Sequence, residues 1–418
     1  MTEQDERPDS AAQISRRRFL DSALWMAGAV AAGAGSWIIP ASPSWAAAPI
    51  KVGIATDLTG ALGFAGNACA NMAKLCADLI NESGGLIGRP VQLFIEDTAT
   101  NEAIGVTKAR RLIERDHVDI VLGGITSSMR NAIKGPIVER GHTLYIYPTL
   151  YEGGECNELI FCTGPTPPQQ CDRLIPWLIQ HGGKRFAFPG ANYIWPHVLN
   201  QYARKLVEKD GGEVVFEEYY PVAQLDYGAT VNRIMTEKID VVFVTIIPPG
   251  VGPFFKQLYE AGFQKRGGRL SCVYYDEIDL TLNTPQEIEG MTSCLDYYLA
   301  VDKIDPGSAK IHHEYQAMFP GTKYLMTGGT NATGMYRGMM LWAEAVKAAG
   351  KLDQDAVIEK LNIAKIQLAP GGPAAMAPGE HHCQMRMYIA VAKNGKFEVI
   401  ESSKGLIDPQ QCAGKHLG

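Results

Sequence analysis

"IKVGIAT" at Ile50–Thr56 decides the fold class, together with the segments that follow it. It is a short run rich in β-branched residues, as a buried parallel strand requires. Apolar residues then recur near helical spacing over 66–83, and GGLIGRP at 84–90 ends that helix. VQLFIED at 91–97 has the composition of a second strand. A strand, a helix and a strand in this order predict a β-α-β unit.

The same alternation continues along most of the chain. Strand-like runs follow at 118–124 and 143–149, and the pattern starts again at 184–190. This order predicts an α/β protein with two doubly wound units of similar layout, and the length beyond residue 48 suffices for two domains. The later segment MRMYIAVAKNGKFEVI at 385–400 predicts a hairpin that turns at Asn394–Gly395.

SRRRFL at Ser15–Leu20 precedes an uncharged, Ala- and Gly-rich segment that ends in AAA at 46–48. A basic region, an apolar region and small residues form the layout of a signal peptide, and Ser-Arg-Arg-x-Phe-Leu fits the twin-arginine signal. We therefore predict that residues 1–48 are a Tat-type signal peptide and that the protein is exported to the periplasm. An uncleaved anchor is the alternative, but the segment is weakly apolar for a membrane span.

Composition and motifs exclude several classes of protein. A net charge of −6 leaves no electrostatic footprint for nucleic acid. No GxSxG, HExxH or strand-linked GxGxxG motif occurs, and the adjacent pairs His312–His313 and His381–His382 do not share a helix face. We therefore predict no catalytic residue, no metal and no cofactor.

The nine cysteines include no CxxC motif, which argues against a zinc ribbon or a thioredoxin-type site. In an oxidising compartment, Cys156 and Cys162 are close enough in sequence to form a disulfide within one loop. Buried free thiols are the alternative for these residues and for the other cysteines.

Polar clusters follow four of the predicted strands. They are GGITSS at 123–128, YIYPTLYEGGE at 145–155, GANYIWP at 190–196 and YYDEIDL at 274–280. In open α/β sheets, ligands bind at the carboxyl ends of strands. Each cluster also has a plain structural interpretation: a helix N-cap, a packed tyrosine loop or a solvated helix start. Together they favour a small polar ligand, because tyrosine offers a flat wall with a polar tip.

From Lys51 to about Glu401 the chain resembles the type I periplasmic substrate-binding proteins of ABC transporters. Within them it is similar to the urea and short-chain-amide branch, relatives of the leucine/isoleucine/valine-binding proteins. The segments on which this resemblance rests are INESGGLIGRPVQLFIEDTATN, YPTLYEGGECNELIFCTGPTPPQQ, GANYIWP and PFFKQLYEAGF. The resemblance implies two Rossmann-like lobes that are joined by three crossovers and close on a ligand, in the manner of a Venus flytrap.

The resemblance also implies boundaries and site residues. The N-terminal lobe is expected at 49–166 plus 300–365, and the C-terminal lobe at 167–299 plus 366–405. Ligand contacts are expected from both lobes, at the following positions: Thr126, Ser127, Tyr147, Thr149, Tyr151, Glu152, Asn192, Tyr193, Tyr275, Asp276 and Glu277.

Two segments depart from the urea-binding pattern. IIPPG at 246–250 stands where those relatives have a polar turn, and YYDEIDL at 274–280 replaces a Ser-x-x-Glu-Glu-Glu-like run. The wall from the C-terminal lobe should therefore be apolar and aromatic, which favours a larger amide, an amino acid derivative or a cationic amine over urea itself.

The function that follows is capture of a small amide, urea-like or amino-acid-type ligand and its delivery to the membrane subunits of an ABC permease. A ligand sensor of the same fold, which would present its closed form to a signalling partner, is the first alternative. An exported amidase-like enzyme is the second alternative, and the missing nucleophile argues against it.

Overall fold

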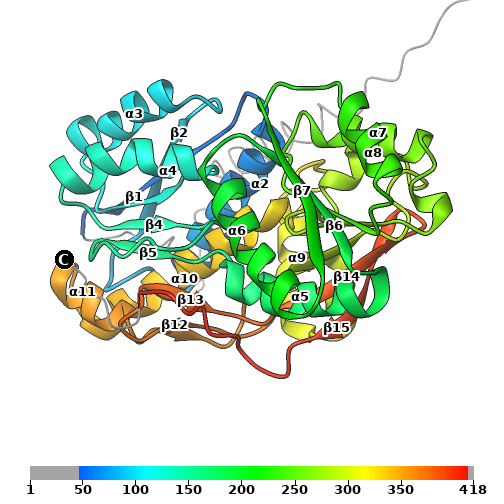
Figure 1. Cartoon of the computed structure of the whole chain (residues 1–418). Coiled ribbons are helices and arrows are strands. Elements are labelled where there is room, and N and C mark those ends of the chain that lie inside the picture. The colour runs from blue at the N-terminus through cyan, green and yellow to red at the C-terminus, as the bar shows by residue number, and fades with distance from the viewer. Residues whose placement is uncertain (1–46, 413–418) are drawn as a thin grey trace, which may run out of the picture. The chain divides into compact units, whose positions relative to one another are not determined.

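The computed structural model describes residues 47–412, which form two α/β lobes (Figure 1). The predicted signal peptide therefore lies almost wholly outside the described residues. Both lobes are built as predicted, from strands that alternate with helices. None of the helices within residues 47–412 is long and apolar enough to cross a membrane.

The first sheet has eight strands in the order β11-β12-β13-β5-β4-β3-β1-β2. Its core is parallel, because β1 pairs in parallel with both β2 and β3. The predicted strands at 50–56 and 91–97 are confirmed residue for residue. The strands are β1 (Ile50–Thr56), β2 (Val91–Asp97), β3 (Ile120–Gly123), β4 (Tyr145–Tyr147), β5 (Ile160–Cys162), β11 (Lys365–Ile366), β12 (Ala374–Ala377) and β13 (His382–Gln384).

The second sheet has seven strands in the order β15-β14-β10-β9-β8-β6-β7. β14 and β15 form the predicted hairpin, and Asn394 and Gly395 at its turn both have positive φ, 51° and 72°. The strands are β6 (Arg185–Ala191), β7 (Glu213–Tyr220), β8 (Val241–Val244), β9 (Arg269–Cys272), β10 (Thr292–Leu295), β14 (Tyr388–Lys393) and β15 (Lys396–Ser402).

Helices connect the strands of each lobe. The first lobe has α2 (Gly63–Glu82), α3 (Glu102–Arg110), α4 (Ser127–Lys134), α10 (Asn331–Ala349) and α11 (Gln354–Leu361). The second lobe has α5 (Pro167–Gly182), α6 (Ile194–Lys209), α7 (Gly228–Thr236) and α8 (Val251–Glu260), and α9 (Pro306–Met318) follows its strand β10. Gly334 lets α10 pack closely on the first lobe, because a Cβ there would lie 1.8 Å from the carbonyl oxygen of Pro148.

The order of strands along the chain shows three passages between the sheets, which lie between β5 and β6, between β10 and β11, and between β13 and β14. One predicted boundary is wrong: residues 366–387 were assigned to the C-terminal lobe, but β12 and β13 pair within the first sheet. The apolar pattern of these short strands does not reveal which sheet they join.

The disulfide considered between Cys156 and Cys162 does not form. Cys156 bonds instead to Cys412, 256 residues further along the chain. Cys162 lies at the end of β5 and is a buried free thiol. The six remaining cysteines are also buried free thiols, which was the alternative to disulfide formation. Sequence proximity was misleading because the β5 strand carries Cys162 into the core.

We expect replacement of both Cys156 and Cys412 by serine to lower the free energy of unfolding by about 2–4 kcal/mol, because the unfolded chain regains the entropy of a long loop. Chemical denaturation of the oxidised wild type and the double variant would measure the loss. A reductant should destabilise the wild type and leave the double variant unchanged. Thiol labelling of the denatured, unreduced wild type should modify seven cysteines; labelling of all nine would contradict this pairing.

Candidate functional site

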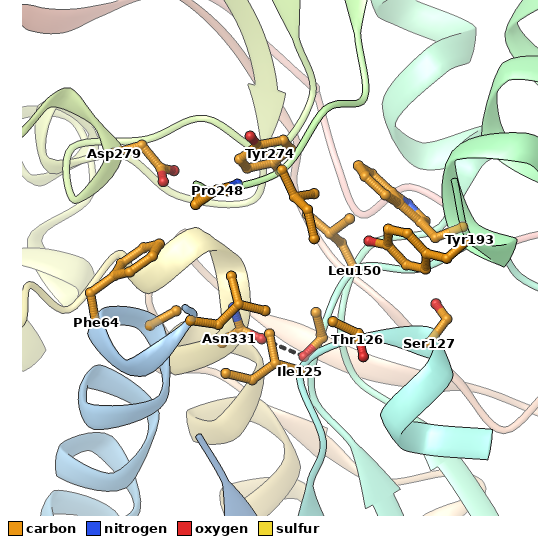
Figure 2. A pocket seen from close by; sticks show the side chains of 15 residues that line it. Phe64, Ile125, Thr126, Ser127, Leu150, Tyr193, Pro248, Tyr274, Asp279 and Asn331 are labelled. Carbon is orange, nitrogen blue, oxygen red and sulfur yellow. Dashed lines mark hydrogen bonds between the residues drawn. The ribbon is translucent and has the colours of Figure 1, made fainter. Parts of the chain in front are cut away.

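A small cavity of about 70 Å³ lies at the carboxyl ends of strands from both sheets (Figure 2). It is lined by segments that follow β1, β3, β4, β6, β8 and β9, and by the start of α10. This is the edge where ligands bind in open α/β sheets. The lining residues are Leu62, Phe64, Ala65, Ile125, Thr126, Ser127, Thr149, Leu150, Tyr193, Trp195, Ile247, Pro248, Tyr274, Asp279 and Asn331.

The turn between β3 and α4 positions Thr126 and Ser127, two polar residues that line the cavity. Gly123 and Gly124 both have positive φ, and a Cβ on Gly123 would lie 1.9 Å from the carbonyl oxygen of Ala55. Glycine therefore lets β3 end close against β1. Thr126 then caps α4, since its hydroxyl oxygen accepts a hydrogen bond from the Met129 N–H at 3.0 Å.

The polar side chains of this wall are held by other groups of the first lobe. Ser127, the first residue of α4, donates its hydroxyl hydrogen to a carboxylate oxygen of Glu152. The hydroxyl of Thr149 lies 3.0 Å from the carbonyl oxygen of Gly124 and also contacts Oδ1 of Asn331. These contacts fix the orientation of both hydroxyl groups.

The facing wall comes from the second lobe and is mainly apolar. Pro248 and Tyr274 face Ile125 and Phe64 across the cavity in Figure 2. The predicted apolar and aromatic character of this wall is confirmed, since Trp195 and Ile247 belong to it as well. The indole N–H of Trp195 is buried and has no acceptor among the described residues.

Acidic side chains gather behind and beside this wall. Asp279 lines the cavity, and burial together with the charge of Asp276 raises its pKa well above the usual value. Glu277 is also buried, and its pKa is raised to about 8 by burial and by Asp276. One oxygen of Glu277 accepts the Leu299 N–H at 2.8 Å, while the other is buried without a partner among the described residues.

The structure brings some of the predicted site residues together at the cavity and leaves others away from it. Those that line the cavity are Thr126, Ser127, Thr149 and Tyr193. Those that are buried without lining it are Tyr147, Tyr151, Glu152, Tyr275, Asp276 and Glu277. Asn192 is exposed and hydrogen-bonded to His197 at 2.9 Å.

Three of these residues surround Arg130, which the sequence analysis did not single out. Arg130 is 4% exposed and pairs with Glu152 at 2.8 Å. Its guanidinium lies over the rings of Tyr147 and Tyr151, at 5.1 and 4.7 Å from their centroids. His382 contacts the Tyr151 hydroxyl, and burial lowers the pKa of His382 to about 4, so it is neutral at pH 7.

The lining residues that lie outside the segments singled out from the sequence come from two places. Leu62, Phe64 and Ala65 follow β1, so the strand-end rule applied to IKVGIAT would have found that segment. Asn331 begins α10 and follows no strand directly, so no local pattern marked it. Within residues 47–412, no group of three or more His, Cys, Asp or Glu residues is placed to hold a metal ion.

Two α/β lobes with a small cavity between their strand ends define a class of protein that binds a ligand between its lobes. Comparison with known proteins gives the family. Residues 49–396 match the family described as periplasmic binding protein. The chain belongs to this family. The chain is therefore classed with binding proteins.

Two curated relatives are moderately similar. The Leu/Ile/Val-binding protein BraC3 of Rhizobium johnstonii is 27% identical over 219 residues, 51% of this chain and 59% of that protein. An amino acid binding protein of Pseudomonas aeruginosa is 24% identical over 265 residues, 59% of this chain and 67% of that protein. The chain thus spans about three fifths of the length of the curated relatives it matches.

Solved structures share the fold at lower identity. A solute binding protein of an ABC transporter from Rhodopseudomonas palustris BisB5, in complex with 3,4-dihydroxybenzoic acid, is 22% identical with a TM-score of 0.76, covering 87% of this chain and 99% of that one. The branched-chain amino acid binding protein LivJ of Streptococcus pneumoniae, in complex with isoleucine, is 17% identical with a TM-score of 0.74, covering 86% and 99%.

Protonation of Glu277 should make stability depend on pH. The folded chain keeps this proton to a higher pH than the unfolded chain, so stability should fall as pH rises from about 4.5 to about 8. Over this pH range, the free energy of unfolding of the Glu277→Gln variant should decrease by about 2–5 kcal/mol less than that of the wild type. Urea denaturation of both proteins between pH 5 and 8 measures the difference. Parallel pH dependence in the two proteins would show that Glu277 does not titrate in this range.

Proposed function

We propose that this protein is the solute-binding component of an ABC transporter. It captures a small amide, urea-like or amino-acid-type ligand between two closing lobes and delivers it to the permease. We further propose that it works in the periplasm and is exported through the twin-arginine route, on the basis of SRRRFL at Ser15–Leu20 and the segment that follows it.

The observation that carries the proposal is the composition of the cavity, which needs both lobes to be complete. Thr126, Ser127 and Thr149 come from the first lobe, whereas Trp195 and Tyr274 come from the second. A ligand that touches both walls binds the closed form better than the open form, so it shifts the population toward closure. The permease would then recognise the closed, loaded protein.

The size and lining of the cavity support a small ligand with an apolar part. A cavity of about 70 Å³ is smaller than the engineered cavity of about 150 Å³ that holds benzene. Ser127 and Thr149 supply hydrogen-bonding groups on one side, and Ile247 and Pro248 supply apolar contact on the other. A short-chain amide or a small amino acid derivative matches this division.

An aromatic acid is the second candidate ligand. Phe64, Trp195 and Tyr274 provide aromatic surface on both sides of the cavity. Several structural relatives are complexes with benzoate or hydroxybenzoates. A ring of that size would require the lobes or these side chains to move apart.

A thermal-shift screen of the protein from Pro49 onward, stripped of ligand, tests the proposal. The panel would contain urea, acetamide, propionamide, isoleucine, small amines and 4-hydroxybenzoate. A compound at 100 times its Kd should add about 2.7 kcal/mol of stability. An amide or amino acid response would support the first candidate, and a response to 4-hydroxybenzoate alone would move the assignment to aromatic acids. The variant Lys256→Gln, at an exposed position outside the cavity lining, should respond to the same compounds as the wild type.

A further inference from the structure

Two hydroxyl groups that line the cavity have already committed their hydrogen atoms. Ser127 donates to Glu152. Thr149 has one hydroxyl hydrogen and two acceptors within reach, the carbonyl oxygen of Gly124 and Oδ1 of Asn331. The amide of Asn331 is oriented by its Nδ2, which donates to the carbonyl oxygen of Gly328 at 2.9 Å. Both hydroxyl oxygens can therefore offer a ligand only lone pairs, as acceptors.

The partner of Ser127, Glu152, is paired with a buried cation. Glu152 pairs with Arg130 at 2.8 Å, and both side chains are 4% exposed. Burial lowers the pKa of Arg130, but Glu152 and the neighbouring tyrosines raise it above its ordinary value overall. Arg130 also lies 3.7 Å from Glu155, which pairs with Lys134 at 2.9 Å. The cluster thus contains two basic side chains, Arg130 and Lys134, and two acidic ones, Glu152 and Glu155. Within it, Glu152 accepts the hydrogen bond from Ser127.

The cavity lining offers no cation to a carboxylate ligand. None of the 15 lining residues is Lys, Arg or His, and burial together with Asp276 raises the pKa of the one acidic lining residue, Asp279, well above its usual value. Burying a carboxylate without a cationic partner costs several kcal/mol. The N-terminal turn of α4 does favour anions, but the Glu152 carboxylate already lies beside it through Ser127.

We propose that Arg130 and Glu152 are positioning residues that hold Ser127 as a hydrogen-bond acceptor, so that the site selects ligands with an N–H donor over carboxylates of the same shape. A carboxamide meets this requirement, because its NH₂ group can donate to the hydroxyl oxygens of Ser127 and Thr149. This inference rests on the proposed function, since it concerns the ligand of the same cavity.

The proposal is tested with two pairs of probes of matched shape, acetamide with acetate and benzamide with benzoate. Calorimetric Kd values would be measured for the wild type and for the double variant Arg130→Met/Glu152→Leu. Without Glu152 the Ser127 hydroxyl is free to donate, so the ratio of amide to acid affinity should fall by about tenfold or more. Replacing both ions by apolar residues of similar volume preserves the fold better than removing one ion.

A second buried ion pair provides the matched control. Arg337 and Asp296 lie 2.5 Å apart and are each 1% exposed, and neither lines the cavity. The double variant Arg337→Met/Asp296→Val should change stability without changing the amide-to-acid ratio. Tighter wild-type binding of acetate or benzoate than of the matching amide, or an equal ratio in wild type and Arg130→Met/Glu152→Leu, would overturn the proposal.

A measurement without ligand separates this proposal from the proposed function. Ser127→Ala and Glu152→Leu, singly and together in the Arg130→Met background, form a double-mutant cycle in chemical denaturation. The bond from Ser127 to Glu152 should appear as a coupling of about fivefold or more in the unfolding equilibrium constant. No coupling overturns the positioning role. If no probe binds the wild type but the coupling is present, the proposed ligand class fails while the orientation of Ser127 stands.

Discussion

Parallel strand pairing is the constraint on which the cavity depends. Parallel neighbours must end at the same edge of their sheet, so every loop that follows such a strand is brought to one side. β1, β3 and β4 obey this in the first lobe, and β6, β8 and β9 obey it in the second. The loops and helix starts that follow these strands supply fourteen of the fifteen lining residues, and Asn331 completes the set from the start of α10.

In the first lobe, charge lies one layer behind this edge. Arg130, Glu152 and Glu155 lie beneath the cavity wall, and the polar residues of this lobe that line the cavity are Thr126, Ser127, Thr149 and Asn331. The strong field of the buried ions therefore acts on a ligand indirectly, through the direction in which a hydroxyl hydrogen points. A neutral polar wall with fixed polarity is well suited to a neutral polar ligand.

The sequence predicted the lobes and most of the strands because hydrophobic periodicity is a local signal, as Ile50–Thr56 illustrates. It also predicted that Thr126, Ser127, Thr149 and Tyr193 would meet, since each follows a strand. Local sequence patterns did not reveal which distant segments pair with one another. Which sheet β12 and β13 join, which cysteine bonds to Cys156, and how Asn331 reaches the cavity all depend on tertiary packing. Arg130 was missed because a basic residue on a helix usually faces solvent.

The bond between Cys156 and Cys412 closes a covalent ring that contains every strand of the second sheet and four strands of the first. A protease that cuts once between these cysteines would open the ring and still leave one covalently joined molecule. All three backbone passages between the sheets lie inside the ring. In an oxidising environment rich in proteases, the two lobes would thus stay attached after a single cut at any passage.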